Sequence, residues 1–263
     1  MQDQILVKQD VIDAFSQLGI KSGTSLIVHC SLKSLGSYLV GGSQTIIEAL
    51  IECVGNKGNI MMPTQSWRNL DPSTGVHGDV PKELYQKIID NIPAYNKHIT
   101  PTNTMGSVAQ MFIHYPGVSR SDHPARSFAA FGQKAIELTQ NHTLEDIFGD
   151  NSPLSRLYNL DGYVLLIGVG YDKNTSLHLA DARANYPQKH DVIEHSAVVE
   201  NGQRVWKAYK TLYVDGEDFE QIGEAFEKAY QVSKVKLAKA TLRLIRQRVL
   251  VNFAVKWIEE NRK

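Results

Sequence analysis

The pattern that most constrains the fold is a pair of short apolar runs on either side of an amphipathic segment. Residues 25–32 (SLIVHCSL) and 58–64 (GNIMMPT) have the length and β-branched content of buried strands. Residues 43–55 between them are apolar at helical spacing, with Ser43 as N-cap and Gly55 beyond the end. Parallel strands need a crossover connection of this kind. The order predicts an α/β fold with a central, mostly parallel sheet flanked by helices.

Further elements follow along the chain. The strongest strand pattern is DGYVLLIGVG at 161–170, and Asn201-Gly202 predicts a hairpin turn within 192–214. KVKLAKATLRLIRQRVL belongs to a basic segment whose apolar positions favour one amphipathic helix from about 234 to 261. A docked, solvated helix is the preferred interpretation of that segment, and a surface for an acidic partner is the alternative. Additional helices are expected at residues 8–19, near 81–91 and near 106–114, and structured segments at 128–132 and 134–140.

The length of 263 residues suits one large α/β domain, so we expect residues 1–263 to fold together. Residues 67–104 interrupt the strand and helix pattern with a polar stretch rich in Pro, Gly and Asn. Loops of that length inside a compact domain usually serve function. We therefore expect residues 67–104 to be a segment on the substrate side.

Charge and cysteine content exclude several classes of protein. Lys plus Arg and Asp plus Glu both number 28, so nothing predicts a nucleic-acid or membrane partner. Cys30 and Cys53 lack paired spacing, and no histidines have the spacing of a metal site, so neither a disulfide framework nor a metal is expected. MQDQILVKQD has no signal-peptide pattern, and no apolar run has the length of a membrane span. These features predict a cytoplasmic protein.

The segment LLIGVGYDKNTSLHLADARANY at 165–186 resembles a nucleotide-binding turn, but a dinucleotide fingerprint needs a third glycine where Lys173 stands. A nucleotide-dependent oxidoreductase is therefore a remote alternative. His178 and Asp181 are spaced to share one face of a helix. A carboxylate beside an imidazole fixes its tautomer and favours the charged form that a general base takes on when it accepts a proton. The simpler alternative is a buried histidine satisfied by a local carboxylate.

Other polar residues have two interpretations each. His29 and Cys30 are neighbours on a strand and point to opposite faces, so they do not form a nucleophile pair, and Cys30 is expected in the core. His123 lies in a polar loop, where a surface position is typical. Gly36 and Gly41–Gly42 follow a strand and precede a helix. Their backbone amides suit a phosphate or pantetheine contact, although an ordinary turn explains them equally.

Several longer motifs occur in a fixed order. They are VHCSLKSLGSYLVGG at 28–42, GNIMMPTQS at 58–66, TMGSVAQMF at 104–112, PGVSRSDHPARSFAAFG at 116–132 and SPLSRLYNLDGYVLLIGVGYDKNTSLHLAD at 152–181. Together they resemble the aminoglycoside 3-N-acetyltransferase family, also called antibiotic N-acetyltransferases. The likeness extends over about residues 9–186 and weakens toward the C-terminus. The family's α/β fold is distinct from the acetyltransferase fold marked by a Q/R-x-x-G-x-G/A loop, and that loop is absent from this sequence.

The resemblance implies an enzyme that transfers an acetyl group from acetyl-coenzyme A to the 3-N amine of an aminoglycoside, conferring antibiotic resistance. It implies that His178 is the general base, that Asp181 orients it, and that Thr175 donates to the thioester oxygen. The coenzyme would be bound by residues of the first motif, Ser31, Leu32, Lys33, Ser34, Leu35, Gly36, Val40, Gly41 and Gly42. Thr64, Ser121, His123 and Ser127 fall in motifs expected to line the same cleft.

The chemistry agrees with this division of roles. Acetyl transfer from a thioester to an amine passes through an oxyanion, which needs a hydrogen-bond donor, and it needs a base for the amine proton. No covalent enzyme intermediate is required if the two substrates meet directly.

Two positions depart from the family pattern, because the family commonly has Glu at Asp181 and Ser at Cys30. A polycationic, polyamine-like acceptor favours carboxylates in the cleft, and Asp71, Asp79 and Asp150 are the candidates. The alternative function is a coenzyme A-binding relative that acts on another amine or is inactive on aminoglycosides. The oligomeric state is not predicted.

Overall fold

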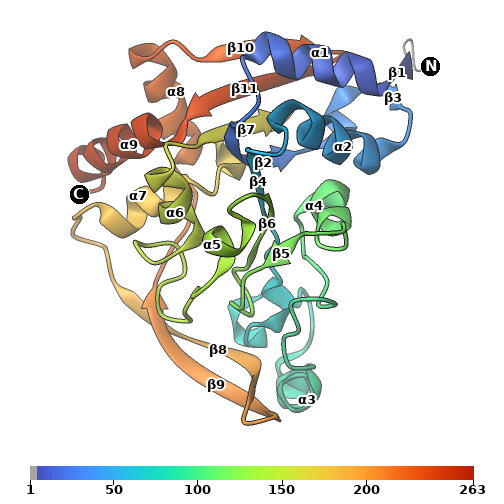
Figure 1. The fold of residues 1–263 in the computed structure, drawn as a ribbon. Helices are drawn as coiled ribbons and strands as arrows, with labels where there is room; N and C mark the ends of the chain where they lie inside the picture. The colour runs from blue at the N-terminus through green and yellow to red at the C-terminus, as the bar shows by residue number, and fades with distance from the viewer. Residues whose placement is uncertain (1–4) are drawn as a thin grey trace.

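The computed structural model describes residues 5–263, and its centre is a seven-stranded sheet with the order β10-β11-β7-β2-β4-β6-β5 (Figure 1). The sheet strands are β2 (Ser25–Cys30), β4 (Asn59–Pro63), β5 (Ser119–Arg120), β6 (Phe128–Gly132), β7 (Tyr163–Ile167), β10 (Ser233–Leu237) and β11 (Ala240–Arg246). The three central strands β7, β2 and β4 are parallel neighbours, and antiparallel pairs extend the sheet on both sides. Because β5 and β10 each reverse direction twice relative to the centre, five of these seven strands point the same way. The predicted mostly parallel, helix-flanked sheet is confirmed.

The prediction of one helix from about 234 to 261 is wrong for its first half. Residues 233–246 form the hairpin β10-β11, and the helix α9 is confined to Gln247–Asn261. Polar and apolar residues alternate in Thr241–Leu244 and in Lys234–Leu237, which is the period of a strand. Pairing of β11 with β7 buries Leu242 and Ile245 in the sheet, and this tertiary pairing outweighs the helical spacing in the sequence.

Helices cover both faces of the sheet, and successive strand residues alternate between two cores. Val28 and Leu165 face the core under α1 (Lys8–Leu18), α2 (Gly42–Val54) and α4 (Gly106–Phe112). Ile27 and Val164 face the opposite core. That second core is covered by α5 (Ala135–Thr139), α6 (Pro153–Asn159), α7 (Leu177–Arg183), α8 (Phe219–Ala229) and α9.

The segment 67–104 is only partly irregular. It contains the short 3-10 helices η2 (Trp67–Asn69), η3 (Pro72–Thr74) and η4 (Lys82–Leu84), and the helix α3 (Tyr85–Asn91). It lies beside the predicted hairpin, which consists of β8 (Asp191–Glu200) and β9 (Gln203–Leu212), at the end of the molecule opposite α1 (Figure 1). The Tyr95 amide donates to the Ala197 carbonyl at 2.9 Å, and Leu70 forms an antiparallel bridge with Ser196. The long hairpin thus supports the segment.

Smaller elements complete the described chain. β1 (Ile5–Leu6) and β3 (Tyr38–Leu39) form a parallel pair, and 3-10 turns occur at η1 (Leu32–Leu35) and η5 (Tyr171–Lys173). Across residues 5–263, every helix is too short or too polar to span a membrane.

Candidate active site

The helix α7 carries the predicted catalytic pair. Leu177, Leu179 and Ala180 bury the other faces of this helix, so His178 is directed toward a cavity. The Nδ1 of His178 lies 3.0 Å from Oδ2 of Asp181, whose side chain is 1% exposed. A carboxylate accepts the Nδ1 proton, which leaves Nε2 free to accept a proton from another group. The two side chains share one face of the helix, as their spacing predicts, and the structure shows that they are in contact.

Two phenylalanines enclose the imidazole of His178. The ring of Phe148 stacks on it, with centroids 4.6 Å apart and planes 6° from parallel. The ring of Phe219, at the start of α8, lies 4.8 Å away at 59°. Both phenyl rings are buried, so they restrict rotation of the imidazole and exclude water from its faces.

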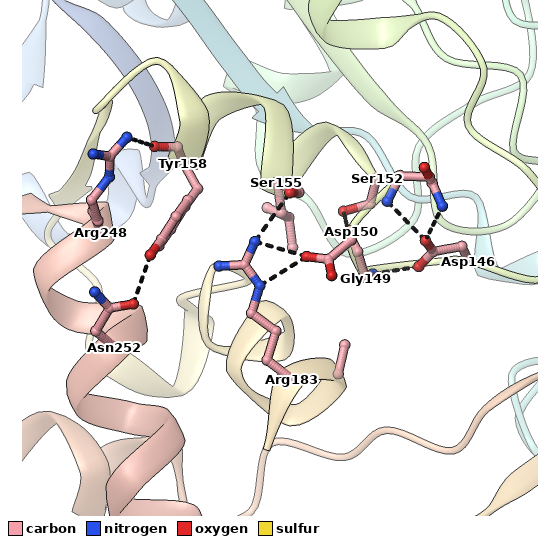
Figure 2. A network of polar contacts seen from close by, with 12 residues as sticks. Asp146, Gly149, Asp150, Ser152, Ser155, Tyr158, Arg183, Arg248 and Asn252 are labelled. Carbon is pink, nitrogen blue, oxygen red and sulfur yellow. Dashed lines mark hydrogen bonds and ion pairs between the residues drawn. The ribbon is translucent and has the colours of Figure 1, made fainter. Parts of the chain in front are cut away.

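A polar network holds the loop that carries Phe148 (Figure 2). The carboxylate of Asp146 accepts the backbone amides of Gly149 at 2.7 Å and Asn151 at 2.8 Å. Asp150 accepts two hydrogen bonds from Arg183 of α7, at 2.9 and 2.8 Å. Asp150, predicted to contact substrate, therefore ties its loop to α7 and lines neither of the two cavities described below.

Asp181 has a second partner at the far end of α9. Its Oδ1 lies 2.7 Å from Nη1 of Arg262. Nε and Nη2 of the same guanidinium each donate a hydrogen bond to the carboxylate of Asp218, both at 2.7 Å. Burial disfavours the charged form of Arg262, but the hydrogen bonds to Asp218 and the charge of Asp181 outweigh it and raise the pKa of Arg262.

Two cavities lie on either side of the start of α7. The first, about 250 Å³, lies at the carboxyl ends of β2, β4 and β7, where open α/β sheets usually bind ligands. Its walls include Ser31, Gly106, Lys173 and Thr175. The second, about 520 Å³, is lined by His178. Thr175, just before α7, therefore borders the first cavity, and His178, in the first turn of α7, borders the second.

The second cavity contains carboxylates that the sequence analysis did not select. Glu194 of β8 and Asp215 line it. Glu194 forms an ion pair with Arg126 at 2.8 Å. No ion pair among residues 5–263 includes Asp215. The predicted Asp71 instead caps η3 by accepting the amide of Ser73, and neither Asp71 nor the exposed Asp79 lines either cavity.

Of the coenzyme residues implied by the first motif, Ser31 lines the first cavity. Ser34 donates to the Ser31 carbonyl at 2.6 Å, which closes the turn of η1 that comprises Leu32, Lys33, Ser34 and Leu35. The left-handed φ of 61° at Gly36 ends that turn, and an added Cβ would lie 2.5 Å from the Lys239 side chain. Gly41 and Gly42 also have left-handed φ and begin α2, next to the exposed Val40. These residues form the turn beside the first cavity.

Thr64, Ser121, His123 and Ser127 are fully buried and line neither cavity. The Oγ of Ser121 lies 3.0 Å from Nδ1 of His142. The buried guanidinium of Arg120 donates to the Thr64 carbonyl at 2.7 Å and to the Ser127 hydroxyl at 3.1 Å. The positions of these four residues point to a structural role in the interior behind the site.

The surface position expected for His123 is wrong. Its Nδ1 accepts the amides of Ala125 and Arg126 at 3.2 and 3.0 Å, forming the turn of its own loop. Burial lowers the pKa of His123 well below its ordinary value, and burial lowers that of the neighbouring His142 to about 4. Both rings are therefore neutral near pH 7.

His29 and Cys30 reach the first cavity from the end of β2. Burial, with a smaller contribution from the nearby His178, lowers the pKa of His29 to about 3. Burial raises the pKa of the Cys30 thiol to about 12, so that thiol is protonated near neutral pH and is a poor nucleophile.

Known proteins are similar to this chain over nearly its whole length. The family model for aminoglycoside 3-N-acetyltransferases matches residues 27–259. The chain is 39% identical to the aminoglycoside N(3')-acetyltransferase-like protein YokD of Bacillus subtilis, covering 97% of this chain and 93% of that protein. It is 33% identical to aminoglycoside N(3)-acetyltransferase IX of Micromonospora chalcea, covering 98% and 93%.

Solved structures agree with the fold. The crystal structure of YokD superposes with a TM-score of 0.94 at 37% identity, covering 99% of this chain and 96% of that one. The structure of AAC-VIa bound to sisomicin gives a TM-score of 0.87 at 29% identity, covering 99% and 100%. With the family match, the near-complete coverage and the shared fold, this chain belongs to the aminoglycoside 3-N-acetyltransferase family.

Proposed function

We propose that this protein transfers the acetyl group of acetyl-coenzyme A to the 3-N amine of an aminoglycoside, with His178 as general base. The observation that carries the proposal is the imidazole of His178, which contacts buried Asp181 and borders the second cavity three residues after Thr175 borders the first. One cavity suits a thioester and the other an amine, and His178 faces the second.

The reaction would proceed by direct attack. The neutral acceptor nitrogen attacks the thioester carbonyl carbon, a C–N bond forms, and the C–S bond breaks as the tetrahedral intermediate collapses. One amine proton passes to Nε2 of His178 and then to the coenzyme sulfur, so coenzyme A leaves as the thiol. Thr175 lines the first cavity and would donate to the oxyanion. Cys30 shares that cavity, but its protonated thiol is unsuited to accept the acetyl group first.

The acceptor side of the proposal has electrostatic support. Glu194, Asp215 and Arg126 give the second cavity two carboxylates and one guanidinium, an excess of negative charge that attracts a polycation. AAC-VIa, a relative of the same fold, binds the aminoglycoside sisomicin. We therefore place an aminoglycoside in the second cavity.

The coenzyme side is supported by position and charge. We propose that acetyl-coenzyme A enters over the turn from Ser31 to Gly36 and the start of α2 at Gly41–Gly42, with its thioester in the first cavity. Lys173 lies in the wall of that cavity and would supply a cation for the phosphate groups of the coenzyme. We also propose a cytoplasmic location, since both Cys30 and Cys53 are free thiols.

Thiol release from acetyl-coenzyme A, followed with a panel of aminoglycosides near neutral pH, tests the proposal. We expect release with at least one of them and its loss in His178→Ala, while coenzyme A still raises the unfolding temperature of that variant. Coenzyme A binding without release would show that the acceptor is another amine. Stabilisation by NAD and not by coenzyme A would sink the acetyl transfer and favour a nucleotide-dependent oxidoreductase.

A further inference from the structure

Asp181, the carboxylate that contacts His178, also contacts a cation. Four side chains from three separate parts of the chain form a continuous series, His178–Asp181–Arg262–Asp218. We propose that Arg262 is a positioning residue for acetyl transfer, which fixes Asp181 and thereby the tautomer and orientation of the base. This inference rests on the proposed role of His178.

Both oxygens of Asp181 are engaged. Oδ2 lies within hydrogen-bond distance, 3.0 Å, of Nδ1 of His178, and Oδ1 forms an ion pair with Nη1 of Arg262 at 2.7 Å without hydrogen-bond geometry. A carboxylate held at one oxygen still rotates about its Cβ–Cγ bond, whereas one held at both does not. Because the aspartate side chain is short, the reach of Asp181 to His178 depends on its rotamer being fixed.

Arg262 is itself restrained on three sides. Its Nε and Nη2 form a two-pronged pair with Asp218, its guanidinium lies 5.0 Å over the ring of Tyr186, and its backbone amide bonds to Ile258 in α9. The planar guanidinium contacts Asp218 through Nε and Nη2 and contacts Asp181 through Nη1. A lysine ammonium reproduces the charge but not this geometry.

The charge of Arg262 also matters for a base that must be neutral to act. A lone buried carboxylate beside His178 would strongly favour the imidazolium form. The guanidinium offsets that charge while leaving the hydrogen bond in place. Among residues 5–263, the other titratable or charged groups that face His178 are His29 from β2 and, across the second cavity, Arg126, Glu194, Tyr213 and Asp215. A substitution at Arg262 leaves these residues unchanged.

Arg262→Met is the direct test, because methionine keeps the apolar stem and removes both the fork and the charge. Lys263→Met is the matched control, since it removes one cation from the next residue, which contacts Gln188 only through its backbone carbonyl. For Arg262→Met we expect kcat/KM for the acceptor to fall about 10- to 100-fold at pH 7, the range seen when outer partners of metal-binding histidines are removed. The acid limb of its pH–rate profile should move to higher pH, and coenzyme A affinity should stay within about twofold, since the first cavity is untouched.

One further measurement and two further variants distinguish a positioning role of Arg262 from a purely structural one. Ring nitrogen NMR of the unliganded enzyme should show the Nδ1–H tautomer of His178 in the wild type and a mixture in Arg262→Met, whether or not a substrate is known. If Arg262→Met does not fold, Asp218→Asn, which loosens Arg262 without touching Asp181, should produce a smaller change in the same direction. Arg262→Lys should recover the pH profile and not the full rate.

The possible outcomes separate the two proposals. A wild type without acetyl transfer overturns the proposed function, whatever Arg262 does to the tautomer. An active wild type that loses activity in His178→Ala, together with unchanged rate, pH profile and tautomer in Arg262→Met, overturns the role of Arg262 alone.

Discussion

Two clusters of buried polar residues lie close together, and they differ in almost every property that matters for catalysis. The cluster around His178 contains ionised groups and borders a cavity. The cluster around His123 and His142 is fully buried, and its histidines are neutral near pH 7 and hydrogen-bond to backbone and hydroxyl groups. Polar residues in a family motif can therefore serve either chemistry or the folding of the loops beside it, and access to a cavity tells the two apart.

The largest expected difference between the clusters is in turnover. His178→Ala should lower kcat by about 10²–10⁴-fold, the usual cost of losing a general base. His142→Phe should leave kcat of the folded enzyme within about threefold, since His142 lies outside both cavities. Steady-state rates and circular dichroism of both variants measure this. Equal losses of kcat in two folded variants would break the distinction.

The second difference is in the pH dependence of stability. His142 has a pKa of about 4 in the folded protein, against about 6.5 in an unfolded chain. The unfolded state therefore binds more protons between these values, so stability is complete above about pH 6.5 and is lost as the pH falls through 4. The shift corresponds to roughly 3 kcal/mol for His142.

Urea unfolding at pH 7.5 and pH 4.5 measures this dependence. We expect the wild type to lose stability at the lower pH and His142→Phe to lose distinctly less. His190→Phe, at an exposed histidine outside the interior cluster, is the control, and the same pH dependence in all three proteins would contradict the assignment.

The third prediction concerns the negative charge of the second cavity, which borders His178 and not the cluster around His123. Asp215→Asn should raise KM for an aminoglycoside about two- to fivefold at low ionic strength and leave KM for acetyl-coenzyme A unchanged, because one exposed carboxylate contributes about 1 kcal/mol or less. Added salt should reduce the effect. Asp79→Asn removes the same charge from a residue outside both cavities and should change neither constant. A larger effect for Asp79 would favour the original sequence-based choice.

The contrast between the clusters also explains what the sequence could predict. The parallel centre of the sheet and the His178–Asp181 pair follow from local patterns, since strand periodicity and a spacing of three act over a few residues. Thr64, Ser121 and Ser127 belong to the same motifs, but sequence gives no measure of burial. The structure places all three in the interior, where Arg120 donates to Thr64 and Ser127 and where Ser121 contacts His142.

What could not be predicted depends on distant parts of the chain. Glu194 of β8 and Asp215, which follows β9, line the second cavity because the β8-β9 hairpin folds beside residues 67–104, and no local pattern encodes that packing. Arg262 lies 81 positions after Asp181, so only the docking of α9 against α7 brings them together. The strands β10 and β11 were predicted as helix because their pairing partner β7 lies far earlier in the sequence.

The smallest expected effect, at Cys30, bears on the direct-transfer mechanism. Cys30 borders the cavity proposed for the thioester, yet burial keeps its thiol protonated, with a pKa of about 12. Cys30→Ser should therefore keep kcat within about twofold, because a similar volume is retained and no acetylated cysteine is required. Rapid-quench mass spectrometry of the wild type mixed with acetyl-coenzyme A alone should find no acetylated protein. An acetyl group on Cys30, together with a loss of rate in Cys30→Ser, would replace direct transfer by a two-step reaction and assign His178 to the activation of a thiol.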